Sequence, residues 1–161
     1  MAEDNASAFF RVQGSFFKSV CSRWGSLIIV FGESMSAFNK WMRPWKTVFQ
    51  KTPREIHLTS PRTQDKSLSL ILLSDVHSPD SFLINEVDHR EFDLVLTLGD
   101  INEATMDYIL NQARLVPVYG VYGNHDPETV AGLDSLDDNV LLINGYRIGG
   151  ISGKEFVRVG D

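Results

Sequence analysis

The stretch LSLILLSDVH, residues 68–77, decides the fold of this chain. Its first six residues form a nearly continuous apolar run, which is typical of a β-strand buried on both faces of a sheet. The polar residues Asp75 and His77 follow at the point where this strand should end. We therefore expect a central strand that carries functional side chains at its carboxyl end.

Two further apolar runs are followed by polar residues in the same way. They are 92–98, which precedes Gly99 and Asp100, and 116–122, which precedes Gly123, Asn124, His125 and Asp126. Apolar residues with helical spacing lie between the strands, at 79–90 and 102–114. This alternation of strands and helices predicts right-handed crossovers and a mainly parallel sheet of the α/β class.

The sequence on both sides of this unit also indicates strands. Residues 55–59 alternate weakly, and a polar loop at 60–66 joins them to the first strand. Residues 139–143 and 146–151 are strand-like and are separated by the dipeptide Asn144-Gly145. Because this dipeptide favours positive φ at both turn positions, it predicts a β-hairpin.

Residues 1–52 form a basic and aromatic arm in our interpretation, separate from a domain at 53–161. Apolar residues recur every three to four positions over 9–31 and again over 35–49, which predicts two amphipathic helices. Gly32 marks the break between them. The fold we expect is therefore a mainly parallel α/β sheet with a β-hairpin, preceded by a helical arm.

Three roles are open for this arm. The apolar faces of the arm could pack on the domain. Alternatively, residues 8–50 could lie on a membrane surface, or the arm could mediate self-association. The most apolar stretch, 24–31, is too short to span a bilayer, which takes about 20 apolar residues. Glu3 and Asp4 stand where a signal peptide would be basic. We therefore expect a cytoplasmic protein, with peripheral attachment to a membrane as the alternative.

Composition and charge exclude several classes of protein. The chain has 161 residues and is 43% apolar, which suits one globular domain. Residues 1–66 hold ten Lys and Arg against five Asp and Glu, and residues 67–161 hold five against sixteen. Such an acidic domain is a poor partner for nucleic acid. Because Cys21 is the only cysteine, no internal disulfide can form.

The three polar clusters should meet at one edge of the sheet. Ligands bind beyond the carboxyl ends of parallel strands, and neighbouring strands lie about 4.8 Å apart. Oxygen and imidazole groups from three such ends can therefore reach a common metal ion. The plainer interpretation is that either Asp75 or Ser78 caps the helix that follows the first cluster, and that Asp100 caps the helix that starts near it. Three clusters in order and in register favour the metal site.

These residues resemble the first sequence blocks of the calcineurin-like metallophosphoesterases. That superfamily shows Asp-x-His, then Gly-Asp, then Gly-Asn-His-Asp or Gly-Asn-His-Glu, and later a lone His and Gly-His-x-His. The resemblance covers residues 54–152. It implies a two-sheet sandwich flanked by helices, and a hydrolase that cleaves a phosphomonoester or a phosphodiester with metal-activated water.

The resemblance also implies a ligand set for one or two divalent metal ions. Asp75 and His77 would bind the first ion, Asp100 would bridge both ions, and Asn124 would bind the second. Mixed carboxylate, amide and imidazole ligands suit Mn²⁺, Fe or Zn²⁺. The implied catalytic residues are His125, which would face the phosphate and stabilise the transition state or protonate the leaving group, and Asp126, which would orient its ring.

The later blocks of the superfamily have no counterpart after Asp126, since no histidine follows it. We therefore expect residues 53–161 to be a carboxy-terminally truncated domain, a partial sandwich that a second chain or second half would complete. The first hypothesis is a metal-dependent phosphoesterase that is incomplete as a lone chain. The alternatives are an inactive metal- or phosphate-binding half domain that acts through a partner, and a gene remnant that folds poorly.

Overall fold

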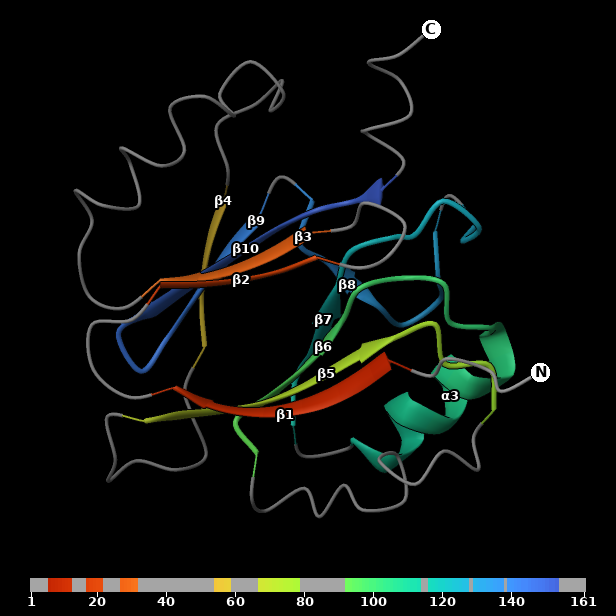
Figure 1. The fold of residues 1–161 in the computed structure, drawn as a ribbon, viewed down its shortest axis with the longest axis horizontal. Coiled ribbons are helices and arrows are strands. Elements are labelled where there is room, and N and C mark those ends of the chain that lie inside the picture. The colour runs from red at the N-terminus through yellow and green to blue at the C-terminus, as the bar shows by residue number, and fades with distance from the viewer. Residues whose placement is uncertain are drawn as a thin grey trace, which may run out of the picture.

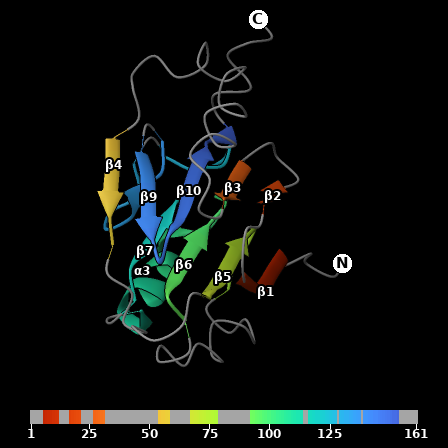
Figure 2. The ribbon, with the colours of Figure 1, turned by 90° about the vertical axis from the view of Figure 1, so that its left-hand side faces the viewer.

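A computed structural model of the chain describes residues 6–12, 17–21, 27–31, 54–58, 67–78, 92–113, 116–127, 129–137 and 139–153. These residues form two five-stranded β-sheets, which face each other as two layers (Figure 1). Helix α3 (Glu103–Gln112) lies on the outer face of one sheet, away from the other. Figure 2 shows the two layers after a rotation of 90°.

The first sheet carries the three apolar runs that the sequence analysis singles out. Its strands, in spatial order, are β1 (Ala6–Val12), β5 (Leu68–Ser74), β6 (Leu94–Thr97), β7 (Val118–Gly120) and β8 (Asp134–Ser135). Strands β5 to β8 are parallel, and β1 pairs antiparallel with β5. The predicted mainly parallel sheet of the α/β class is therefore confirmed.

Strand β5 is buried along its whole length, as its continuous apolar run predicts. Because side chains alternate between the two faces of a strand, Leu70 and Leu72 pack between the sheets, while Ile71 and Leu73 pack on the side of α3. Strand β5 thus contributes to two hydrophobic clusters at once.

The second sheet contains the predicted hairpin. Its strands, in spatial order, are β2 (Phe17–Cys21), β3 (Leu27–Phe31), β10 (Tyr146–Ile151), β9 (Asn139–Ile143) and β4 (Arg54–His57). Neighbouring strands are antiparallel except β4 and β9, which are parallel. The turn between β9 and β10 has φ of 51° at Asn144 and 82° at Gly145, which confirms the prediction made from this dipeptide.

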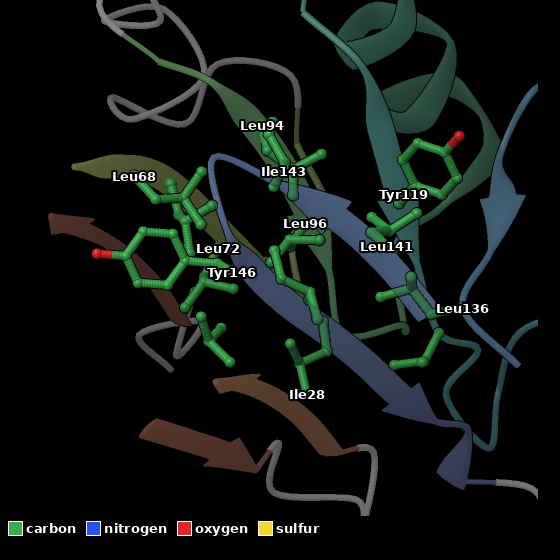
Figure 3. Packing of buried hydrophobic residues seen from close by; sticks show 14 of the residues in the cluster. Ile28, Leu68, Leu72, Leu94, Leu96, Tyr119, Leu136, Leu141, Ile143 and Tyr146 are labelled. Atoms are coloured by element: carbon green, nitrogen blue, oxygen red, sulfur yellow. The ribbon is translucent and has the colours of Figure 1, made fainter. Parts of the chain in front are cut away.

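The main core fills the space between the sheets (Figure 3). Leu96 of the first sheet and Leu141 and Ile148 of the second are fully buried in it. A second cluster lies under α3, where Met106 and Ile109 pack with residues of β5 and β6. The helix predicted at 102–114 is therefore confirmed, and the first sheet is covered on both faces.

The prediction of a helical arm is wrong for its first run of apolar residues. Within 9–31, where we expected an amphipathic helix, the described residues belong to β1, β2 and β3. Residues 27–31 (LIIVF) are rich in β-branched side chains, which favour a strand. Each of these strands also has a neighbour in a sheet. Strand β1 pairs with β5, β2 pairs with β3, and β3 pairs with β10.

Two other helical predictions lie outside the described residues. They are the run at 35–49, on which the membrane-surface alternative now depends, and the helix at 79–90. In the part of the chain that the structure describes, no helix combines the length and the hydrophobicity needed to cross a bilayer.

Candidate functional site

Three loops follow the carboxyl ends of β5, β6 and β7, which are neighbouring parallel strands. These loops carry the three polar clusters of the sequence analysis. Hydrogen bonds join the first loop to the second and the second to the third, so the clusters form one connected edge of the sheet.

The first two loops are joined at Asp75 and at His77. The backbone N–H of Asp75 donates to the carbonyl oxygen of Gly99 over 3.3 Å. The side-chain Nδ2 of Asn102 donates to the carbonyl oxygen of His77 over 2.6 Å. Ser74, the last residue of β5, also contacts the first loop, since its Oγ donates to Oδ2 of Asp75 over 2.9 Å.

The second and third loops are joined by reciprocal bonds between Asp100 and the segment that contains Asp126. The backbone N–H of His125 donates to Oδ1 of Asp100 over 3.0 Å. In return, Oδ2 of Asp126 accepts from the backbone N–H of Asp100 over 2.9 Å and from that of Gly123 over 2.7 Å. Each carboxylate therefore holds the backbone of the other loop.

The backbone is strained at both acidic positions. Asp75 has φ of 54° and Asp100 has φ of 57°, in the left-handed region that side chains other than glycine rarely adopt. Such a conformation costs about 1–3 kcal/mol per residue and persists only where surrounding bonds impose it. Gly99, with φ of 86°, lies so close to the backbone of Gly123 that a Cβ atom would fall within 3.0 Å of it.

Asp100 has the most unusual electrostatic environment of the site. Its side chain is 5% exposed, and its Oδ2 is buried without a hydrogen-bond partner among the described residues. Burial raises the pKa of this carboxyl above its ordinary value, and the negative charges of Asp126 and Asp75 raise it further. The N–H and the positive charge of His125 oppose the increase.

This arrangement fits a divalent cation in its chemistry. An unpaired buried carboxylate oxygen beside two more carboxylates is a set of ligands that hard and borderline metal ions prefer. The set is incomplete, because no group of three or more His, Cys, Asp or Glu side chains in the described residues could hold a metal ion. The side chains of His77 and Asn124 are exposed at the rim.

The two predicted catalytic residues differ from each other in exposure to solvent. His125 is exposed in the third loop, while Asp126 is half-buried. The carboxylate of Asp126 binds two backbone N–H groups through Oδ2, so it orders the loop. Its predicted role in orienting the ring of His125 stays a prediction.

Asn102 is a structural residue of the site that was not predicted from the sequence. This residue is the N-cap of α3, because its Oδ1 accepts from the backbone N–H of Thr105 over 2.8 Å. The plainer interpretation, in which Asp100 caps this helix, is therefore wrong. An Asn directly before a helical pattern is itself a capping signal, and it would have identified the residue.

A link between β10 and the third loop was also missed. The backbone N–H of Tyr122 donates to Oγ of Ser152 over 2.8 Å, and the N–H of Ser152 donates to Oδ1 of Asp137 over 2.9 Å. The Oγ of Ser152 also donates to Oδ2 of Asp137. Because the bonded partners lie 30 and 15 positions apart in sequence, no local pattern indicates this support.

The comparisons with known proteins agree with this geometry. A family model described as "Calcineurin-like phosphoesterase superfamily domain" matches residues 68–157, which is more than half of the chain. An uncharacterized protein of Haemophilus influenzae is 26% identical over 94 residues, which cover 52% of this chain and 42% of that relative. The matched region thus spans less than half the length of the relative. No solved structure matches the chain.

Proposed function

The chain belongs to the calcineurin-like phosphoesterase superfamily, and from this premise we propose that it is a metal-dependent phosphoesterase. The reaction would be hydrolysis of a phosphomonoester or a phosphodiester. The observation that carries the proposal is the Asp100 carboxylate, which is buried, lies beside two other carboxylates and has one oxygen without a hydrogen-bond partner among the described residues.

A buried carboxylate with one oxygen left without a hydrogen-bond partner is costly unless a cation balances its charge. In the proposed site, Asp75 and His77 would hold one ion, Asn124 would hold a second, and Asp100 would be a ligand of both. The ions would be Mn²⁺, Fe or Zn²⁺, and when bound they would polarise the phosphoryl oxygens and lower the pKa of a bound water molecule.

The residues of the chain supply the rest of the chemistry. The bonds that Asp126 and Asp100 accept from the N–H groups of Gly123 and His125 fix the backbone of the third loop, and His125 is exposed in this loop. In this position the imidazolium of His125 would donate a proton to the leaving-group oxygen. Acid catalysis by one positioned side chain contributes about 10²–10⁴-fold to a rate.

A second candidate function is favoured by the incomplete ligand group. The described residues lack three suitable His, Cys, Asp or Glu side chains around one point, and the matched region covers 42% of the relative. In this alternative the chain binds metal or phosphate without turnover. A second chain or second half would then supply the remaining ligands and act on the phosphoester substrate.

The test of the first proposal is hydrolysis of an aryl phosphodiester and an aryl phosphomonoester by the full chain with added Mn²⁺. We expect Asp100→Asn to abolish turnover, because it removes the charge that balances the ions. Asp107→Asn is the matched control, since Asp107 is exposed on α3 and the same charge is lost. Activity that survives Asp100→Asn would refute the assignment of the site.

Mn²⁺ binding measured by calorimetry separates the two candidate functions. Binding that depends on Asp100, without turnover, favours the half domain that acts through a partner. Turnover that is lost in His125→Gln and kept in His57→Gln favours the enzyme. His57 is a suitable control because it is exposed on β4, which belongs to the other sheet.

A further inference from the structure

We propose that Asn102 is a positioning residue of the metal site, because it fixes the loop of His77 to the amino end of α3. This inference rests on the proposed function, since it takes Asp75, His77 and Asp100 as ligands. Asn102 is not among the residues to which the resemblance assigns a role, and its side chain is exposed.

Asn102 forms hydrogen bonds through both its side-chain amide and its backbone carbonyl. Its Oδ1 accepts from the N–H of Thr105 over 2.8 Å, and its backbone carbonyl accepts from the N–H of Met106 over 2.9 Å. These two bonds are what any N-cap residue makes. The third bond, from Nδ2 to the carbonyl oxygen of His77 over 2.6 Å, is no part of a helix cap and reaches a loop 25 residues away in sequence.

This third bond connects a proposed ligand to a rigid element. Helix α3 is held against the first sheet by the buried residues Met106 and Ile109. Asn102 also follows Asp100 by two positions, so it belongs to the loop that carries another proposed ligand. An anchored backbone at His77 limits the directions from which its exposed side chain can reach an ion shared with Asp100.

The strained backbone of the first loop explains why such an anchor matters. Asp75 has a φ of 54°, which the loop would leave if nothing held it. The N–H of Asp75 is bound to Gly99 at one end of the segment, and the carbonyl of His77 is bound to Asn102 at the other. Without the side chain of Asn102, the segment loses the hydrogen bond that holds the backbone of the proposed ligand His77.

Substitution by serine separates this role from plain helix capping. Ser caps helices about as well as Asn, but its short hydroxyl cannot replace the amide that reaches His77. Asn102→Ser therefore keeps the cap, keeps the charge and removes the link. Asn111→Ser is the matched control, since Asn111 is exposed on the same helix and its Nδ2 donates to the carbonyl of Asp107 over 2.8 Å.

Two measurements on the full chain test the proposal. We expect Asn102→Ser to weaken Mn²⁺ binding about tenfold or more, as is typical when a residue that supports a metal ligand is removed. In the metal-free protein, the amides of residues 75–78 should exchange hydrogen faster in Asn102→Ser. Asn111→Ser should leave both quantities at their wild-type values, although it loses the same kind of hydrogen bond.

Wild-type Mn²⁺ affinity or unchanged amide exchange at 75–78 in Asn102→Ser overturns the proposal and leaves Asn102 as a helix cap. A wild-type chain that binds no Mn²⁺ overturns the proposed function, and this inference with it. The two failures are distinguishable, because the second appears in the unaltered protein and the first only in the variant.

Discussion

Gly123→Ala is expected to destroy the proposed metal site while the sandwich stays folded. Gly123 lies directly under the Asp100 carboxylate, and a Cβ atom at this position would fall well inside 3.0 Å of Cγ and both carboxylate oxygens. Real Cβ atoms essentially never come so close. The carboxylate must therefore move, and it cannot move without losing the N–H of His125 that Oδ1 accepts.

The cost follows from these contacts. Overpacking of a well-packed site costs about 1–3 kcal/mol. Loss of a hydrogen bond to a charged group costs about 1.5–3 kcal/mol. The lower chain entropy of Ala in the unfolded state returns about 0.4–1 kcal/mol. The net loss of about 1.5–5.6 kcal/mol lowers the melting temperature by roughly 3–22 °C in a chain of this size.

Thermal unfolding and Mn²⁺ calorimetry measure the two consequences. Gly149→Ala is the control, because a Cβ atom there would lie 4.0 Å from Cγ2 of Val140, an ordinary contact. We expect Gly149→Ala to leave both the melting temperature and the binding of Mn²⁺ unchanged. If Gly123→Ala binds Mn²⁺ with the affinity of the wild type, Asp100 is not a ligand and the proposed metal site is refuted.

Three further changes test other parts of the structure. Asp100→Asn should raise the melting temperature of the metal-free protein at pH 7, and the gain should shrink toward pH 4. Burial and nearby carboxylates raise the pKa of Asp100 in the folded state. The folded wild type therefore loses stability as the pH rises from the ordinary pKa of 3.8 through the raised pKa. An equal increase in melting temperature at pH 4 and pH 7 would contradict this explanation. Asp93→Ala should lower stability by about 1–3 kcal/mol, because the buried Oδ2 of Asp93 accepts from the N–H of Ser69 over 2.8 Å, and urea unfolding measures the loss. Leu141→Ala should cost about 2–5 kcal/mol by the same measurement, since Leu141 is fully buried between the sheets, whereas a loss under 1 kcal/mol would mean that the two layers do not share a core.

The central strand β5 and the β9–β10 hairpin were predictable because their signals are local. The continuous apolar run of β5 and the dipeptide Asn144-Gly145 each determine their structure within a few residues. Convergence of the three loops followed from a general property of parallel sheets, and the hydrogen bonds between Asp75, Asp100 and Asp126 and neighbouring loops are consistent with it. Their roles as ligands and catalysts remain predictions.

The strands near the amino terminus could not be predicted in the same way. Residues 27–31 form a short apolar run, and periodicity alone does not distinguish a buried strand from a buried helix in such a run. What decides the outcome is pairing with β10, which lies near the other end of the described chain. The link from Asn102 to His77 was hidden for the same reason, since its two ends are 25 residues apart.

On the ribosome, β3 is made long before its partner strand β10. Arg147 of β10 pairs with Phe31 of β3 and follows it by 116 positions. At a synthesis rate of about 5–20 residues per second, the nascent chain waits roughly 6–23 s for this partner. Until β10 is made, β3 can pair only with β2, although Ile28 and Val30 of β3 end in the core. Translation must therefore reach β10 before the second layer can close, and a chaperone that shields residues 27–31 should raise the yield of folded protein.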